Sequence, residues 1–398
     1  MSVRKIAIII ERADTGLGGA ERSVFDLSEA LQSAGLDVHI LAAKGKLDKS
    51  SNIRVHLLAD YLPGKRIGFF TFMKLLKKHL SENYYDIIHS VLPFDFADIY
   101  QPRAGSYPEA ILRNAASYEN AILKTFKKIT ATVNIRRTIL HRAEKKLCGN
   151  PNGPVVAALS KYVAEQFKNH YDLANKRIAI IPNGVKIDVS PSAAETYNLS
   201  NRIFSQFNIK EIQKPILFLF AANNFRLKGL TILIKALKAA ISNNHLCYLF
   251  VIGNDNPSKY FNMAKNLGVE KYIAFLGTVS NVNPLFAISD VAVLPTYYDP
   301  SSRFILEALA AGKPVITTRF NGAVDLFTNN RHGIVLDNPD DVKSLADALQ
   351  YFSNQENIRK ASEAIVSDKL KDNISIELAA KQIIQLYENI VSKRGRKC

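Results

Sequence analysis

Two acidic residues, Asp299 and Glu307, flank the start of a predicted helix with seven residues between them. Ser301 or Ser302 is a natural N-cap for the apolar run that follows, and Gly312 ends that run. Asp299 is therefore expected in the loop before the helix, and Glu307 inside the helix. Amides at a helix N-terminus bind phosphate, so the segment suits a nucleotide sugar held between two acids. The alternative is a surface helix with an acidic first turn and no ligand.

Two cations, Arg226 and Lys228, lie in a polar loop that runs from Asn223 to Gly229 directly after an apolar strand. The planar fork of arginine and the point charge of lysine together suit a diphosphate. Gly229 lets the backbone turn into the next helix. Because cations in loops are usually solvated, a loop without a ligand is the alternative.

A glycine-rich turn, Gly16-Leu17-Gly18-Gly19, leads from the first apolar strand into a predicted helix. Its amides are placed to approach an anion at the helix N-terminus. The turn is not a dinucleotide fingerprint, because Glu21 stands where the third glycine of that motif would be. A tight turn without a ligand is again the alternative.

Each of these segments follows an apolar strand, which is where ligands bind in an open α/β sheet. Lys5 to Ile10 is a buried-strand pattern, and residues 20–34 carry apolar side chains at helical spacing up to Gly35. The second half of the chain repeats this alternation, with strands expected at 216–221, 248–252, 273–276, 291–294 and 315–318. A turn at 182–184 separates the halves. We therefore predict two α/β domains with parallel sheets.

Composition limits the classes of function. A chain of 398 residues is long enough for two cores, and no apolar run approaches the roughly 18 residues of a membrane span, so we expect a cytoplasmic protein. Cys148, Cys247 and Cys398 lack the spacing of a zinc site or a disulfide framework. The formal charge of +16 favours an anionic partner. A nucleic-acid partner is not expected, because no nucleic-acid-binding motif is present.

An acid, seven residues and Glu307, followed by Ala-Leu-Ala-Ala-Gly-Lys-Pro-Val-Ile, resemble the signature of the retaining glycosyltransferases of family 4. The resemblance includes Gly18 to Arg22, Ile180 to Val185 and Arg226 to Gly229, so it covers nearly the whole chain in order. The chain looks most like the branch of lipopolysaccharide-core glucosyltransferases. The segments that support this branch are Leu92 to Asp98, Val251 to Pro257 and Leu267 to Val269.

This family resemblance implies the GT-B fold, in which two Rossmann-like domains face each other across a cleft. We accordingly expect an acceptor-side domain over 1–184 and a nucleotide-sugar-binding domain over 185–370. Residues 371–398 are expected to form a helix that returns to the N-terminal domain and ends in a basic tail.

The resemblance also implies the role of each site residue. Glu307 would bind the ribose hydroxyls, Asp299 the hydroxyls of the donor sugar, and Arg226 and Lys228 the departing diphosphate. Ala274 and Phe275 would face the base, while the amides of 301–303 and Gly19 would hold phosphate oxygens. The full set implied on the donor side is Gly18, Gly19, Asn224, Ala274, Phe275, Ser301, Ser302, Arg303 and Leu306. The residues implied on the acceptor side are Asp95, His89 and Glu21, and Asp95 is counted with Asp299, Glu307, Arg226 and Lys228 among the implied catalytic residues.

The expected reaction is transfer of a hexose, glucose from a UDP-sugar, to a lipopolysaccharide-core or similar glycolipid or glycan acceptor, with retained anomeric configuration. No Asp-x-Asp pair occurs, so cations and amides would replace a metal, and no cofactor is expected. We expect a monomer. Asp299 stands where the family usually has Glu, which leaves open a second hypothesis, a catalytically weak sugar-nucleotide or glycan binding subunit.

The stretch from Arg103 to Lys146 is rich in cations. Ile122, Leu123, Phe126 and Ile129 lie at helical spacing among them. A basic amphipathic helix can lie on an anionic membrane surface, so we expect peripheral binding to the inner face of the cytoplasmic membrane. The alternative is an ordinary helix whose apolar stripe packs on the sheet.

Overall fold

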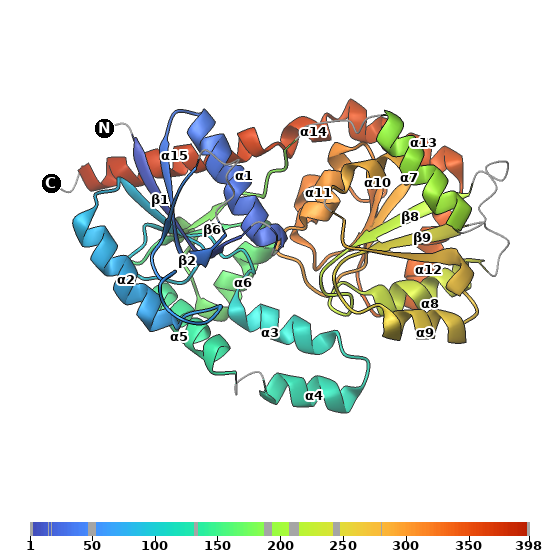
Figure 1. Cartoon of the computed structure of the whole chain (residues 1–398), viewed down its shortest axis with the longest axis horizontal. Helices are drawn as coiled ribbons and strands as arrows, with labels where there is room; N and C mark the ends of the chain where they lie inside the picture. The colour runs from blue at the N-terminus through green and yellow to red at the C-terminus, as the bar shows by residue number, and fades with distance from the viewer. Residues whose placement is uncertain are drawn as a thin grey trace. The chain divides into compact units, whose positions relative to one another are not determined.

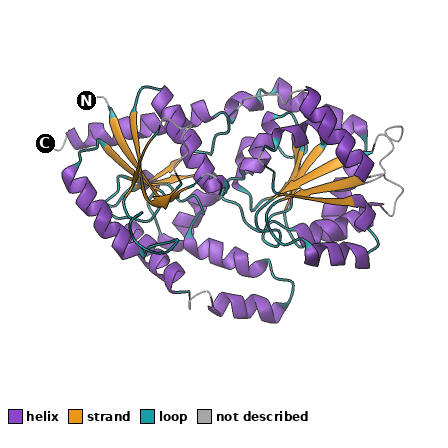
Figure 2. Cartoon of the chain, in the orientation of Figure 1, coloured by secondary structure: helices purple, strands orange, loops and turns teal. Residues whose placement is uncertain are grey.

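The computed structural model describes residues 3–14, 16, 18–46, 53–130, 134–186, 193–206, 215–241, 247–279 and 281–395. The chain forms two compact α/β units, each built on a parallel sheet with helices against it (Figures 1 and 2). Unit 1 comprises residues 1–115, 119–186 and 375–398, and unit 2 comprises residues 116–118 and 187–374. The fold is therefore the predicted pair of Rossmann-like α/β domains.

The boundaries between the units differ slightly from those expected at 184 and 370. They lie after Lys186 and Ile374, because Val185 bridges to Ser375 and the Ile376 amide donates to the Val185 carbonyl at 3.0 Å. Residues 187–192 and 207–214 of the expected second domain, and 396–398 of the basic tail, lie outside the described residues.

Among its described residues, unit 1 has a seven-stranded parallel sheet in the order β3-β2-β1-β4-β5-β6-β7. The strands are β1 Lys5–Ala13, β2 Asp37–Gly45, β3 Arg54–Leu57, β4 Ile87–Ser90, β5 Ile99–Tyr100, β6 Val155–Ala158 and β7 Ile178–Ile180. The strand order reverses between β1 and β4, because β2 lies on one side of β1 and β4 on the other.

Helices cover both faces of this sheet (Figure 2). The helices of this part of the chain are α1 Gly19–Ser33, α2 Phe69–Glu82, α3 Tyr107–Ala116, α4 Ala121–Thr130, α5 Ile135–Gly149, α6 Lys161–Tyr171 and α15 Ile376–Gly395, with a 3-10 turn, η2, over Asn175–Arg177; α4 does not pack its apolar stripe on the sheet. None of the helices among the described residues of the chain is both long and apolar enough to span a bilayer.

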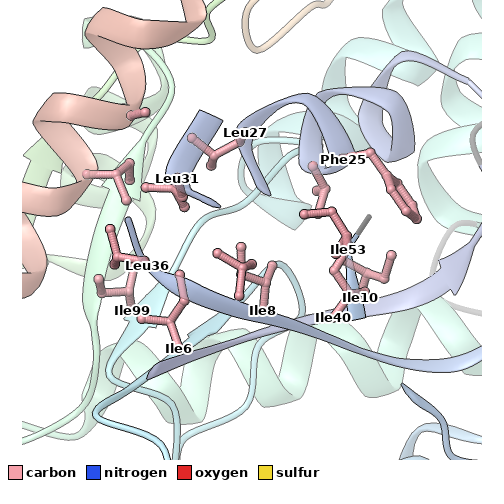
Figure 3. Packing of buried hydrophobic residues seen from close by; sticks show 14 of the residues in the cluster. Ile6, Ile8, Ile10, Phe25, Leu27, Leu31, Leu36, Ile40, Ile53 and Ile99 are labelled. Atoms are coloured by element: carbon pink, nitrogen blue, oxygen red, sulfur yellow. The ribbon is translucent and has the colours of Figure 1, made fainter. Parts of the chain in front are cut away.

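The apolar run of β1 divides between two cores, as side chains alternate along a strand. Ile6, Ile8 and Ile10 pack with Leu27 and Leu31 of α1 (Figure 3). Ala7 and Ile9 face the opposite side, where they pack with residues of α2 and α5. β1 is therefore covered on both faces, as its sequence predicts.

The C-terminal helix α15 completes the first of these cores. Ala379, Ala380 and Ile383 are buried in the same cluster as β1 and α1, and the Tyr387 hydroxyl is hydrogen-bonded to Nδ1 of His89 at 2.7 Å. The last segment of the chain therefore belongs to the domain that the first segment begins.

Unit 2 has a six-stranded parallel sheet among its described residues, in the order β10-β9-β8-β11-β12-β13. Its strands are β8 Ile216–Ala221, β9 Cys247–Ile252, β10 Ile273–Gly277, β11 Val291–Leu294, β12 Val315–Thr318 and β13 Gly333–Leu336. Counted within the unit this is the order 3-2-1-4-5-6 of a doubly wound nucleotide-binding sheet. The order reverses between β8 and β11.

The helices of unit 2 connect these strands. They are α7 Ala193–Gln206, α8 Leu230–Ile241, α9 Ser258–Asn266, α10 Asn283–Ile288, α11 Arg303–Ala310, α12 Val342–Tyr351, α13 Gln355–Ser367 and α14 Leu370–Asn373, with 3-10 turns η4 Glu270–Tyr272 and η5 Gly322–Leu326. The apolar face of α8 is buried, including Leu230, Leu233 and Leu237.

Three histidines pack together where β2, β3 and α2 meet. Nδ1 of His39 lies 2.8 Å from Nε2 of His56, and the His79 ring lies 5.1 Å from the His56 ring. Burial lowers the pKa of His56, and the neighbouring His39 and His79 lower it further. Burial also lowers the pKa of His79, against an opposing effect of Glu82.

We expect the His56→Gln, His79→Gln double variant to lose part of the pH dependence of unfolding. Both imidazoles have their ordinary pKa of about 6.5 in the unfolded chain, whereas the folded chain lowers both pKa values and so holds the imidazoles neutral to lower pH. The wild-type free energy of unfolding therefore falls as pH drops below that value. Urea unfolding at about pH 8 and about pH 5 measures this. The wild type should lose more stability than the variant, and parallel losses would contradict the assignment.

Candidate functional site

The loops after β8 and β11 come together at the point where the strand order of unit 2 reverses. The Tyr297 amide donates to the Leu227 carbonyl at 2.9 Å, which joins the two loops by a backbone hydrogen bond. Ligands of open α/β sheets bind outside the carboxyl ends of the strands at this reversal. Two of the three segments predicted to contact a ligand, the loops after β8 and β11, therefore lie together at the expected place for a ligand.

Gly229 is required for this close approach. Its φ of +84° lies in the left-handed region, and a Cβ built on it would lie 2.0 Å from the Pro295 carbonyl oxygen. No residue with a side chain fits there without moving the end of β11. Glycine thus fixes the distance between the two loops as well as the turn into α8.

Lys228 and Asp299 form an ion pair across the two loops. The lysine Nζ lies 2.6 Å from Oδ2 of Asp299 and 2.9 Å from the Tyr298 carbonyl oxygen. Both side chains are mostly buried, at 19% and 15% exposure. The other oxygen of Asp299 accepts from the Ser301 amide at 3.2 Å. A cation and an acid predicted from separate motifs are therefore neighbours in space.

Helix α11 begins as predicted, with the Ser302 hydroxyl as its N-cap, accepting from the Ile305 amide at 3.5 Å. Arg303 and Glu307 pair one turn apart on its surface at 3.1 Å, with Glu307 27% exposed. The Arg303 fork and the Glu307 carboxylate are thus held together at the start of the helix, next to the loop of Asp299.

Several donor-side groups at the start of α11 already have contacts within unit 2, and their roles toward a donor stay predictions. The amides of Ser301 and Ser302 donate to Oδ1 of Asp299 and Oδ1 of Asn321, both at 3.2 Å. The Leu306 side chain is fully buried, because the helix turns its apolar face to the core. Sequence spacing placed these residues near the site but did not show what they contact.

Arg226, Asn224, Ala274 and Phe275 also lie in unit 2, whereas Gly18 and Gly19 lie in unit 1. The Arg226 guanidinium lies 3.8 Å from the ring centroid of Tyr118, which packs with this unit. Asn224 shapes its own loop, accepting from the Leu227 amide at 3.0 Å through its side chain. Ala274 and Phe275 lie in β10, the edge strand, whose end meets β9 through the Gly253 amide and the Gly277 carbonyl at 2.9 Å.

Unit 1 has a cavity of about 200 Å³ at the reversal of its own sheet, which we call the unit 1 cavity. Its walls come from the end of β1, the first turns of α1, the chain after β4 and residues 100–107. Glu21 lines it, while Gly18 and Gly19 precede Glu21 at the start of α1. The glycine turn thus leads into one wall of this cavity.

Two residues predicted on the acceptor side, His89 and Asp95, differ in burial and in hydrogen-bond partner. His89 is fully buried in unit 1 and hydrogen-bonded to Tyr387, and its role on the acceptor side stays a prediction. Burial lowers its pKa to about 3, which keeps the ring neutral. Asp95 is partly exposed and pairs with Lys146 at 2.8 Å. That hydrogen bond from Lys146 lowers the pKa of Asp95. Asp95 does not line the unit 1 cavity.

Sequence reasoning missed most charged residues of the cavity. Glu11, Arg12 and Arg103 line it together with Glu21. Glu11 and Arg12 directly follow the apolar run of β1, and this adjacency was a usable signal, because charged residues at the end of a buried strand lie at the ligand-binding edge of the sheet. Within the described residues, no group of three or more His, Cys, Asp or Glu side chains is arranged to hold a metal ion.

The two halves of the chain match two family models. Residues 17–189 match the model of Glycosyltransferase Family 4, and residues 201–367 match that of glycosyl transferases group 1. The first range lies mostly in unit 1 and the second lies in unit 2, while α15 of unit 1 lies outside both ranges.

Curated relatives agree with these matches. The lipopolysaccharide glucosyltransferase WaaG of Escherichia coli K12 is 32% identical over 203 residues, which are 50% of this chain and 53% of that protein. The matches to the first curated relatives span between about half and two thirds of their lengths.

Solved structures share the fold over nearly the whole chain. A crystal structure of WaaG aligns over 96% of this chain and 99% of its own with a TM-score of 0.76 and 20% identity. Anabaena HepE in complex with UDP-glucose aligns over 97% of this chain and 99% of its own with a TM-score of 0.69 and 16% identity. At these identities the likeness shows the fold.

We expect Gly229→Ala to destabilise unit 2 more than Gly312→Ala does. Both glycines have positive φ, +84° and +72°, but a Cβ at Gly312 would meet nothing within 4 Å. Gly312→Ala should therefore cost only the left-handed backbone penalty of about 1–2 kcal/mol, whereas Gly229→Ala adds the clash with Pro295. Urea unfolding measures the difference. Equal losses of stability would mean that the loops tolerate separation.

Proposed function

The chain belongs to glycosyltransferase family 4 and has the GT-B fold, and from this membership we propose that it transfers glucose from UDP-glucose to a lipopolysaccharide-core or similar glycolipid or glycan acceptor. We propose further that the enzyme acts as a monomer, retains the anomeric configuration, and needs neither a metal ion nor a cofactor.

The observation that carries this proposal is the pairing of Lys228 with Asp299 where the strand order of unit 2 reverses. A mostly buried cation beside an acid, one loop away from the Arg303–Glu307 pair, offers opposite charges to the two ends of a nucleotide sugar. The diphosphate needs cations, and the hydroxyls of ribose and hexose need carboxylate acceptors. The similar fold of HepE has been solved in complex with UDP-glucose, and the similar WaaG is a lipopolysaccharide glucosyltransferase, which supports this donor and acceptor here.

In the proposed reaction, Lys228 and Arg226 stabilise charge as it develops on the leaving UDP. Such preorganised electrostatic stabilisation contributes the most where water is excluded. Asp299 accepts hydrogen bonds from the hydroxyls of the donor sugar, and Glu307 accepts them from the ribose. Oδ2 of Asp299 lies 2.6 Å from the ammonium of Lys228. The carboxylate that orients the donor sugar therefore also positions the cation that stabilises the leaving UDP.

Retention follows if the acceptor hydroxyl attacks from the face that UDP leaves. The bond from the anomeric carbon to the β-phosphate oxygen breaks, and the bond from that carbon to the acceptor oxygen forms. The acceptor proton passes to the departing phosphate oxygen, so the protein need not supply a base. Its residues bind, orient and neutralise charge.

We propose that α4 binds the anionic surface on which a lipid-borne acceptor lies. Ile122, Leu123 and Phe126 are 78%, 44% and 56% exposed, so within this helix the apolar stripe is not packed on the sheet. The cations Lys124, Lys127 and Lys128 lie on the same helix. In contrast, Leu140 and Leu147 of α5 are buried. Of the basic stretch, α4 is therefore the membrane-facing element; residues 131–133 and the side chain of Ile129 lie outside the described residues.

We expect glucose transfer from UDP-glucose to crude lipopolysaccharide to continue in EDTA, because cations and amides replace a metal ion in the proposed mechanism.

We expect Glu307→Ala to weaken UDP binding roughly ten- to hundredfold. Each charge-assisted hydrogen bond to ribose contributes about 1.5–3 kcal/mol, at 1.4 kcal/mol per tenfold in affinity. Calorimetric titration with UDP measures the binding, and NMR of the product measures the anomeric configuration.

Glu363→Ala is the matched control, because Glu363 also pairs with an arginine one turn away, on α13. Its UDP affinity should equal that of the wild type. Activity lost in EDTA and restored by Mg²⁺, or inversion at the anomeric carbon, would contradict the mechanism. UDP binding without turnover of any sugar would indicate a binding subunit.

We expect the variant with Lys124, Lys127 and Lys128 changed to Glu to lose binding to anionic vesicles. Each lysine near an anionic surface contributes about 1 kcal/mol, so three amount to roughly hundredfold in affinity. Co-sedimentation with anionic and with neutral vesicles measures the loss. The control changes Lys259, Lys265 and Lys271 of unit 2 to Glu, with the same change in net charge. Equal losses in both variants would show a general charge effect without a role for α4.

A further inference from the structure

Unit 2 has a groove of about 680 Å³ that is lined by residues of β13, α12 and α13 and of the turn before β13. We call it the edge groove, because β13 is the last strand in the order of the sheet. Its volume lies within the roughly 300–1,000 Å³ of pockets that bind small molecules.

The edge groove does not belong to the site of Lys228 and Asp299. The loops of that site follow β8 and β11, whereas Asn330 and Arg331 of the groove directly precede β13. Because the strands are parallel, the start of β13 lies at the opposite edge of the sheet from the ends of β8 and β11. β12 also lies between β11 and β13. A ligand in the groove would therefore be separate from the donor.

Three polar side chains of the edge groove have no hydrogen-bond or ion-pair partner among the described residues. They are the amide of Asn330, the carboxylate of Asp347 and the hydroxyl of Tyr351. Nδ2 of Asn357 donates to the Tyr351 carbonyl at 2.8 Å, which leaves the amide oxygen of Asn357. The groove thus offers both donors and acceptors.

An aromatic ring lies beside an apolar floor in the edge groove. Tyr351 is 47% exposed, and its ring packs edge-to-face on the buried Phe352, with centroids 5.1 Å apart. Leu336, Ala348 and Ala361 are buried and line the floor. The Tyr351 ring is therefore supported from within the domain and still accessible to a ligand.

Hydrogen bonds fix the backbone where β13 begins. Nε and Nη2 of Arg331 each donate to Asp368 at 2.6 Å, and Nε2 of the buried His332 lies 2.8 Å from the same carboxylate. Asn330 has a left-handed φ of +60°, and its backbone amide donates to the Gly333 carbonyl at 2.8 Å. The rim of the groove is thereby preorganised, and Asp368 neutralises the guanidinium.

The other charges around the edge groove leave one carboxylate without a counter-charge. Lys360 lies 3.5 Å from Oε1 of Glu356. Arg359 pairs with the same acid and with Glu363, so the two cations and two acids of α13 cancel. Asp347 of α12 has no ion-pair partner among the described residues. The surplus of one negative charge disfavours a phosphorylated or acidic ligand.

We propose that the edge groove binds a neutral oligosaccharide, with one sugar ring packed on Tyr351 and its hydroxyls hydrogen-bonded to Asp347 and Asn330. A sugar ring has an apolar C–H face and a rim of hydroxyls that both donate and accept. These features match an accessible aromatic ring beside an amide and a carboxylate that have no other partner. The inference goes beyond the proposed function, because it assigns a second glycan site, which holds a part of the glycan remote from the reacting hydroxyl.

Ligand-observed saturation-transfer NMR with neutral trisaccharides tests this in the presence of excess UDP. The probes are cellotriose, maltotriose and α-mannotriose, and the oxidised form of the tightest binder, with carboxylates at C6, is the anionic counterpart. We expect at least one neutral trisaccharide to bind the wild type with a Kd below about 10 mM. The oxidised form should bind at least about tenfold more weakly.

Tyr351→Ala should weaken binding at least about tenfold, and Tyr351→Phe, which keeps the ring, should restore most of it. Asn330→Gly should also weaken binding, since glycine keeps the left-handed backbone and removes only the amide. Asp347→Asn should narrow the discrimination against the oxidised trisaccharide. The matched controls are Tyr197→Ala, an exposed tyrosine of α7, and Asp372→Asn, an exposed acid of α14. All five variants should keep the UDP affinity of the wild type.

The signal that Tyr351→Ala removes belongs to the edge groove, even if a trisaccharide also binds elsewhere. Three results would overturn the proposal: no binding by any neutral trisaccharide, equal binding by the wild type and Tyr351→Ala, or tighter binding of the oxidised form. Binding of trilysine in place of the trisaccharides would do so as well, because the groove would then be a cation site.

UDP affinity by calorimetry separates this result from the proposed function. A wild type that binds UDP but no trisaccharide refutes only the edge groove. A wild type that binds a trisaccharide through Tyr351 but fails to bind UDP refutes only the glycosyltransferase proposal.

Discussion

The close backbone approach of Gly229 to Pro295 determines where the functional groups of unit 2 stand. A side chain at this position would overlap the Pro295 carbonyl oxygen, so only glycine lets the loops after β8 and β11 share a hydrogen bond from Tyr297 to Leu227. That contact brings Lys228 next to Asp299, and both side chains are mostly buried. A buried ion pair stabilises a protein only when its geometry is good. The Lys228–Asp299 pair therefore depends on the close approach of the two loops that Gly229 permits.

Unit 1 depends in the same way on polar groups buried inside its core. Glu144 joins β5, α3 and α6 to α5 through Tyr100, Tyr107 and Tyr171. Burial raises the pKa of Glu144 to about 7, while each of these partners donates a hydrogen bond to it. A hydrogen bond between His89 and Tyr387 likewise connects β4 to the C-terminal helix. These networks specify a unique packing where apolar contacts alone would permit several.

Regular features of the sequence predicted most of the architecture. Apolar runs marked β1 and β8 through β12, helical spacing marked α1 and α8, and the Ser302 cap marked the start of α11. The site in unit 2 was predictable to the level of which loops meet, because strand order and ligand position are linked. What each residue contacts was not predictable. Leu306 faces the core, the amides of Ser301 and Ser302 are engaged, and His89 is fully buried.

The sequence by itself determined two α/β domains, the family, and the loops that carry chemistry, because periodicity and turn residues are local properties that a single strand or helix expresses alone. Tertiary structure alone decided which charged groups meet. Glu11 reaches Arg136 across 125 positions, and Lys228 reaches Asp299 across 71. Tertiary structure also decided that Glu21 faces a cavity and Asp95 a lysine. Such pairings arise only when separate elements pack, and no local pattern records them.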